Sequence, residues 1–166
     1  LGFKAAIFAF SVGTPPADAS AVRDYLPALR AAQRGGHLVA FHEYFANYAD
    51  DLTVVGQNWG YLCRRYNKTL ALAGLTPRDV RVGITECGAD VIPQIPISGP
   101  YRGRISPRKY VGELATLADW WDQDGVLGGA VFMDGSWNTA QWGLYDISLD
   151  KETRKLLYQY IETGTF

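Results

Sequence analysis

The stretch Arg81-Val-Gly-Ile-Thr-Glu-Cys-Gly-Ala-Asp90 indicates both a fold and a candidate site. It begins as a short apolar run, which is typical of a buried parallel strand, and it ends abruptly in Thr-Glu-Cys-Gly. Glu86 is thereby placed at the carboxyl end of the strand. In β/α barrels this end carries the catalytic residues, so Glu86 is a candidate functional carboxylate. The alternative is a glutamate that caps a helix or lies on a surface loop.

The same order of strand and helix is repeated along the whole chain. Apolar runs predict strands, and amphipathic segments with capping residues predict helices. The predicted strands cover residues 4–10, 37–41, 80–85 and 126–133. The predicted helices run from Asp18 or Ser20 to residue 32, over 58–73, from Ser106 to the Trp120-Trp121 pair, and from Leu149 or Asp150 to Ile161.

Strands that alternate with helices predict an α/β fold with a parallel sheet and right-handed crossovers. Four βα units are half of the eight that close a barrel. We therefore expect a single domain over residues 1–166 that forms half of a TIM-type (β/α)8 barrel. The competing architecture is an open doubly wound sheet, but the loop after the first strand lacks the Gly-x-Gly-x-x-Gly phosphate-binding pattern.

Composition lowers the expectation of several partners. The chain has 16 basic and 17 acidic residues with no run of either sign, which gives no reason to expect nucleic acid or an anionic membrane surface. No apolar stretch approaches the roughly 20 residues that span a bilayer. Cys63 and Cys87 lack zinc-ligand spacing, and the acidic and histidine residues form no ligand cluster. We expect no metal and no cofactor.

A second motif, His42-Glu-Tyr44, ends the second predicted strand. Side chains alternate across a strand, so His42 and Tyr44 share one face and Glu43 takes the other. If the shared face is the barrel lumen, both side chains stand beside Glu86 on the next strand. A phenol that donates to a carboxylate keeps it oriented for nucleophilic attack. The alternative is a core histidine and a packed tyrosine.

The order of these motifs resembles the second half of a clan A glycoside hydrolase barrel, strands five to eight. The resemblance rests on Phe-Ser-Val-Gly-Thr-Pro at 10–15, Gly36-His-Leu-Val-Ala-Phe-His-Glu-Tyr44, Ile84-Thr-Glu-Cys-Gly88 and Val126-Leu-Gly-Gly-Ala-Val-Phe132. It implies a retaining glycosidase that acts on carbohydrate, with Glu86 as the nucleophile and His42 and Tyr44 as its supports.

The resemblance also implies an acid/base glutamate in an Asn-Glu pair on the fourth barrel strand, and this sequence contains no Asn-Glu dipeptide. Retaining hydrolysis needs two carboxyl groups roughly 5 Å apart. The acid is thus expected outside this chain, with Glu43 as a possible substitute that strand alternation turns away from the lumen. The chain alone is expected to need a partner, either another copy of itself or a missing N-terminal half-barrel, because two sheet edges are left unpaired.

Other candidate residues lie in the loops after the strands. Trp137 and Trp142 are candidates for stacking on a sugar ring, and Asp90 and Asp134 for binding sugar hydroxyls. Loop packing and turn formation are the alternatives for these residues. The sequence does not fix the compartment, although a secreted or cell-surface location fits the resemblance best.

Two other functions remain open. A non-catalytic carbohydrate-binding or structural half-barrel would bind oligosaccharide without releasing reducing sugar. An unrelated α/β enzyme or nucleotide binder would hold its ligand in a crevice of the sheet and ignore glycans. A turnover assay distinguishes the non-catalytic half-barrel from an enzyme. A thermal-shift screen with nucleotides would identify a nucleotide binder.

Overall fold

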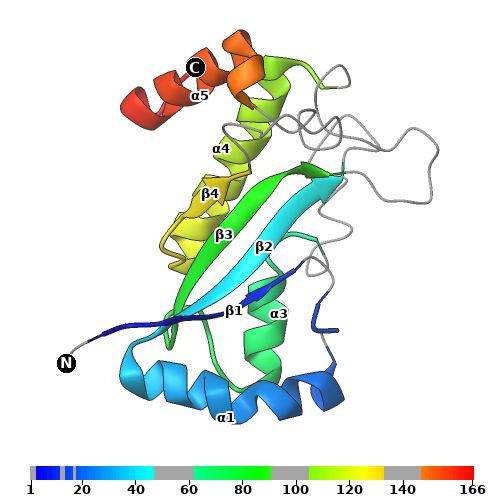
Figure 1. Cartoon of the computed structure of the whole chain (residues 1–166), viewed down its shortest axis with the longest axis vertical. Coiled ribbons are helices and arrows are strands. Elements are labelled where there is room, and N and C mark those ends of the chain that lie inside the picture. The colour runs from blue at the N-terminus through cyan, green and yellow to red at the C-terminus, as the bar shows by residue number, and fades with distance from the viewer. Residues whose placement is uncertain (1–2, 12–13, 17, 47–61, 91–104, 133–146) are drawn as a thin grey trace.

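The computed structural model describes residues 3–11, 14–16, 18–46, 62–90, 105–132 and 147–166. Within them, four strands form one sheet in the order β1-β2-β3-β4, and every neighbouring pair is parallel. A helix separates each strand from the next along the chain (Figure 1). The α/β class and the parallel, sequential sheet predicted from the sequence are confirmed.

The two central strands reach further than the apolar runs that predicted them, and the two outer strands are shorter than theirs. The strands are β1 (Ala6–Phe10), β2 (Leu38–Ala46), β3 (Arg81–Asp90) and β4 (Gly129–Val131). The helices are α1 (Ala19–Gly35), α3 (Arg65–Leu72), α4 (Pro107–Asp124) and α5 (Lys151–Thr163), and a short 3-10 helix, η2 (Ile147–Leu149), precedes α5. Because β2 and β3 extend beyond their predicted ends, both candidate motifs lie within strands and not in the loops that follow.

Three helices begin at side-chain caps that lie where the sequence predicts the helices to start. Asp18, Ser106 and Asp150 each accept a hydrogen bond from a backbone N–H in the first turn of the helix. Such a cap satisfies a donor that has no partner within the helix. α1 and α4 end at Gly36 and Gly125, which take the left-handed conformation that terminates a helix. Local chemistry therefore fixes most of the element boundaries.

The helix predicted over residues 58–73 begins only at Arg65. The preceding residue, Arg64, has a φ of 53°, a left-handed conformation that a right-handed helix does not contain. Leu62 and Cys63 are buried but are not helical. At these positions the helical spacing of apolar residues reflects burial, and not a helix.

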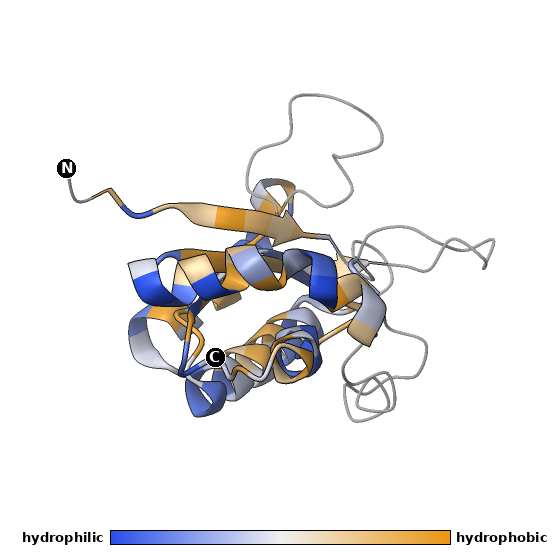
Figure 2. Ribbon diagram, turned by 90° about the horizontal axis from the view of Figure 1, so that it is seen from below, coloured by the Kyte–Doolittle hydropathy of each residue, from blue (hydrophilic) through white to orange (hydrophobic). Residues whose placement is uncertain are grey.

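Helices α1, α3 and α4 cover one face of the sheet. Phe41 of β2 packs against Tyr66 of α3 with ring centroids 6.3 Å apart, and Phe45 packs against Tyr110 of α4 at 5.8 Å. Phe10 of β1 continues this layer, because its ring lies 5.3 Å from Phe41 and also contacts a tyrosine of α1. Figure 2 shows the helices banded in hydrophilic and hydrophobic colours, as expected for elements with one apolar side.

An irregularity in β3 decides which way Glu86 points. Phe41 pairs with Ile84, but the next residue of β2, His42, pairs with Glu86, so Thr85 is an extra residue in β3. The pairing of β3 with β4 shifts at the same place. A bulge of this kind reverses the alternation of the side chains that follow it. Glu86 therefore shares a face with His42, whereas Ile84 belongs to the helix-covered face.

Strands β1 and β4 form the edges of the sheet, and among the described residues neither has a second neighbouring strand. The pairing of β1 with β2 is interrupted between Ile7 and Phe10. The intervening Phe8 and Ala9 have left-handed φ values of 79° and 51°, an unusual conformation for residues with side chains. Both edges are thus short or irregular, unlike the long central pair of β2 and β3.

Candidate functional site

The candidate site lies toward the carboxyl ends of the two central strands, on the face opposite the helices. His42 is paired with Glu86 across β2 and β3, and Tyr44 is paired with Gly88 two residues further on. Alternation along β2 puts His42 and Tyr44 on one face, and the bulge at Thr85 brings Glu86 to the same face.

Two side chains of β2 contact one oxygen of Glu86. The hydroxyl of Tyr44 donates a hydrogen bond to Oε2 of Glu86 at 2.9 Å. Nδ1 of His42 lies 3.3 Å from the same oxygen. The predicted proximity of these three residues is therefore confirmed, whereas the catalytic roles of the three residues stay predictions.

Two of the three side chains are only partly buried, whereas Tyr44 is buried. The side chains of His42 and Glu86 are 18% and 35% exposed. Both contacts from β2 fall on Oε2, so the carboxylate is held from one side and Oε1 is used by neither partner. This arrangement orients the carboxylate through one of its two oxygens.

Two further residues shape the site, and sequence reasoning did not single them out. A Cβ at Gly88 would lie 3.2 Å from both the carbonyl oxygen of Phe132 and the hydroxyl of Tyr110, so a side chain here would crowd these two groups beside Tyr44. The ring of Phe132 packs edge-on against Tyr44 with centroids 6.4 Å apart. The only signal in the sequence is their position, directly after the Thr-Glu-Cys run and at the end of the last apolar run.

Glu43, the possible alternative acid, lies on the helix-covered face. Its side chain is fully buried, and its Oε2 accepts a hydrogen bond at 2.9 Å from Nε1 of Trp121 on α4. Its orientation away from Glu86 is as strand alternation predicts. A carboxyl group on the back of the sheet has no contact with a substrate beside Glu86, and this geometry disfavours Glu43 as the acid.

Burial dominates the protonation of Glu43. Loss of hydration raises the pKa of this carboxyl to about 8, although the indole of Trp121 and the backbone N–H groups of Arg64 and Arg65 oppose the rise. Among the described residues, Oε1 has no hydrogen-bond partner of normal geometry. Glu43 is accordingly a neutral carboxylic acid at neutral pH.

The predicted substrate-binding residues fall largely outside the described part of the chain. Trp137, Trp142 and Asp134 lie outside the described residues, and only the backbone of Asp90 is described, as the last residue of β3. Two tryptophans of α4 pack within the described structure: Trp121 is buried, and the ring of Trp120 lies under the guanidinium of Arg64 at 5.6 Å.

Within the described ranges, no group of three or more histidine, cysteine, aspartate or glutamate side chains could hold a metal ion. The same ranges contain no helix with the length and apolar character needed to cross a membrane. Comparisons of the chain with protein-family models, with curated proteins and with solved structures found no match. The argument for function therefore rests on the site itself.

Proposed function

We propose that the chain is half of a glycoside hydrolase-like (β/α)8 barrel, and that Glu86 is the nucleophile of a retaining reaction on an O-glycosyl bond. The observation that carries this proposal is the placement of the Glu86 carboxylate near the carboxyl ends of a parallel sheet, in contact with Tyr44 and His42. Catalytic carboxylates of barrel enzymes occupy this end of the sheet.

The topology supports a half-barrel over a doubly wound sheet. A doubly wound sheet reverses its strand order, has helices on both faces and binds its ligand where the order reverses. Here the described strands follow sequence order without reversal, and α1, α3 and α4 pack on one face. The same topology argues against the nucleotide-binding alternative, which needs such a crevice.

In the proposed reaction, one oxygen of Glu86 attacks the anomeric carbon while the bond from that carbon to the leaving oxygen breaks. The leaving oxygen departs with the bonding electrons and takes a proton from the acid, and water later hydrolyses the glycosyl ester. Tyr44 and His42 hold Oε2, so Oε1 is the oxygen directed at the sugar. The acid comes from another half-barrel, because Glu43 lies behind the sheet.

That second half-barrel would also cover the free edges of β1 and β4. Unpaired strand edges invite pairing, and eight parallel strands close into a barrel whose interior is filled by side chains. We propose that either a second copy of this chain or an N-terminal half supplies these strands.

Covalent trapping tests the proposal. A 2,4-dinitrophenyl 2-deoxy-2-fluoro-β-glycoside needs no acid, because its leaving group departs as a stable phenolate, and the fluorine slows hydrolysis of the ester. The glucoside, galactoside and mannoside are incubated with this chain and with any longer product of its reading frame. We expect a mass increase of one fluoroglycosyl group on the peptide that contains Glu86.

Control variants make the result specific. Glu86→Gln should abolish labelling, whereas Glu162→Gln, at an exposed position of α5, should leave it unchanged. Labelling of another carboxylate, or none with any of the three glycosides, contradicts the nucleophile assignment.

The missing Asn-Glu dipeptide favours one alternative, a half-barrel that binds carbohydrate without hydrolysing it. This alternative predicts saturable binding of an oligosaccharide with no labelling and no release of reducing sugar. Calorimetric titration with the same oligosaccharides used for turnover assays separates the two functions.

A further inference from the structure

We propose that Glu43 and Trp121 form a positioning pair behind the sheet, which holds the end of β2 so that His42 and Tyr44 meet Glu86. Their hydrogen bond joins β2 to α4 at 2.9 Å across 78 residues of sequence. Glu43 stands between His42 and Tyr44 in the chain, so any shift of its backbone moves both side chains that contact Glu86. The catalytic consequence of this pair rests on the proposed function, whereas its structural consequence does not.

The indole of Trp121 is fixed by two contacts. On one side it lies against Gly129 of β4, where a Cβ would come within 2.5 Å of the ring. Its Nε1 reaches Glu43 of β2, so the ring passes over the outer face of the sheet from β4 to β2. Gly129 is therefore required for the ring to lie close enough to the sheet to donate this hydrogen bond.

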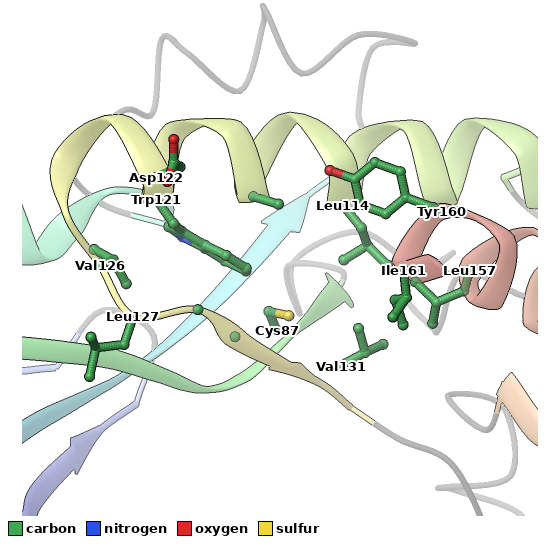
Figure 3. Close-up of a pocket in the computed structure, with 13 residues that line it drawn as sticks. Cys87, Leu114, Trp121, Asp122, Val126, Leu127, Val131, Leu157, Tyr160 and Ile161 are labelled. Carbon is green, nitrogen blue, oxygen red and sulfur yellow. The ribbon is translucent and has the colours of Figure 1, made fainter. Parts of the chain in front are cut away.

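Beside the ring there is space into which it could move. A cavity of about 300 Å³ lies between β4, α4 and α5, and Trp121, Leu114, Val131 and Leu157 are among its lining residues. Figure 3 shows the Trp121 ring extending from α4 toward β4 and Cys87, with α5 on the far side of the cavity. Since close packing does not confine the ring on that side, the hydrogen bond to Glu43 is what keeps it in place.

Among the titratable groups packed around Glu43 that are described next, Glu43 is the one whose charge changes near neutral pH. Cys87 on β3 and Cys63 before α3 face it, and burial raises the pKa of both thiols, that of Cys87 to about 12. Tyr66 of α3, also nearby, has its pKa raised chiefly by burial. Arg64 stays charged, because Asp124 holds its guanidinium against the effect of burial. Ionisation of Glu43 above pH 8 would thus place a charge in this layer that Arg64, already paired with Asp124, offsets only in part.

The test uses three variants in which no residue on the front face of the sheet is substituted. Glu43→Gln keeps an oxygen that accepts from Trp121 and mimics the neutral acid. Glu43→Leu removes the acceptor, and Gly129→Ala pushes the indole toward the cavity without touching Glu43. If Glu43→Leu fails to fold, Gly129→Ala carries the same test.

The structural readout is the ring spectrum of His42 by ¹³C–¹H NMR. The chain contains 2 histidines, and the other, His37, lies before β2 and accepts a hydrogen bond from the backbone of Ala5, so it is an internal control. We expect Glu43→Leu and Gly129→Ala to shift the resonances of His42 but not those of His37. Glu43→Gln should leave both at their wild-type positions. Unchanged His42 resonances in folded Glu43→Leu or Gly129→Ala would overturn the positioning role.

The functional readout is the rate of labelling by the fluoroglycoside. Displacement of a positioned group by about 1 Å lowers rates about 100-fold, and we expect losses of about 10- to 100-fold in Glu43→Leu and Gly129→Ala. Glu43→Gln should be labelled at the wild-type rate at pH 7. Between pH 7 and 9 the labelling rate of the wild type should fall as Glu43 ionises, whereas the rate of Glu43→Gln should stay constant. If the wild type is never labelled, the proposed function fails while the NMR result still decides the positioning role. Equal rates and equal pH profiles in all variants would refute the inference.

Discussion

The two faces of β2 place neighbouring residues in opposite environments. In front of the sheet, Glu86 is 35% exposed and receives contacts from His42 and Tyr44 on one oxygen. Behind it, Glu43 is fully buried, hydrogen-bonded to Trp121, and has its pKa raised to about 8 mainly by burial. The same functional group is thus held oriented in one place and kept neutral in the other. The surroundings, and not the residue type, decide what a carboxyl group can do.

The largest expected effect comes from the front carboxylate. Glu86→Gln should lower fluoroglycoside labelling by several orders of magnitude, because an amide cannot form the glycosyl ester. Thermal unfolding should change little, since the side chain is partly exposed. Mass spectrometry of the intact protein measures the labelling. If the variant is still labelled at the wild-type rate, another residue is the nucleophile.

Removing one hydroxyl group tests the contact that orients Glu86. Tyr44→Phe deletes the hydrogen bond to Oε2 but keeps the ring that packs against Phe132. A hydrogen bond to a charged group contributes about 1.5–3 kcal/mol, which corresponds to a loss of roughly 10- to 150-fold in labelling rate. Tyr158→Phe, at an exposed position of α5, is the matched control. An unchanged rate in Tyr44→Phe would mean that this contact does not assist the reaction.

Behind the sheet, pH should affect stability through Glu43. The unfolded chain ionises this group near pH 4.5, whereas the folded chain keeps it protonated up to about pH 8. The folded state therefore binds one more proton in this window, and the free energy of unfolding falls as pH rises across it. The contribution levels off above pH 8, where both states are ionised.

Glu43→Gln removes this titration and should make the protein more stable than the wild type at pH 8, by up to a few kcal/mol, while the difference shrinks toward pH 4.5. Thermal unfolding at a series of pH values measures the effect, with Glu162→Gln as the control for an exposed glutamate. A constant difference between wild type and Glu43→Gln over this range would show that Glu43 is not buried in the neutral form.

The smallest expected effect concerns the two thiols on the covered face. Cys63 and Cys87 are buried, and burial raises both pKa values, so neither presents a thiolate to solvent. A coloured disulfide reagent should react with the folded wild type only slowly and with both thiols at once after denaturation. In Glu43→Leu the reaction should be faster, because the layer behind the sheet is loosened. Rapid reaction in the wild type would mean that this face is open.

Much of the fold could be predicted from the sequence because its causes are local. Ser106 caps the helix that it was expected to cap, Asp18 and Asp150 begin helices at one of the two positions predicted for each, and four apolar runs became four parallel strands in sequence order. Alternation along a strand also placed His42 and Tyr44 on one face and Glu43 on the other. These features depend on residues within a few positions of each other.

By itself, the sequence determined the α/β class, the order of the strands and the motifs that lie toward the carboxyl ends of the two central strands. Only the tertiary structure decided that Thr85 is an extra residue in β3, which turns Glu86 to the face of His42, because a bulge is defined by pairing with other strands. The contact between Glu43 and Trp121 could not be predicted from the sequence either, since 78 residues separate them. Whether a carboxyl group stays partly exposed or is buried and neutral depends on such distant neighbours, since desolvation arises from packing and not from the local chain.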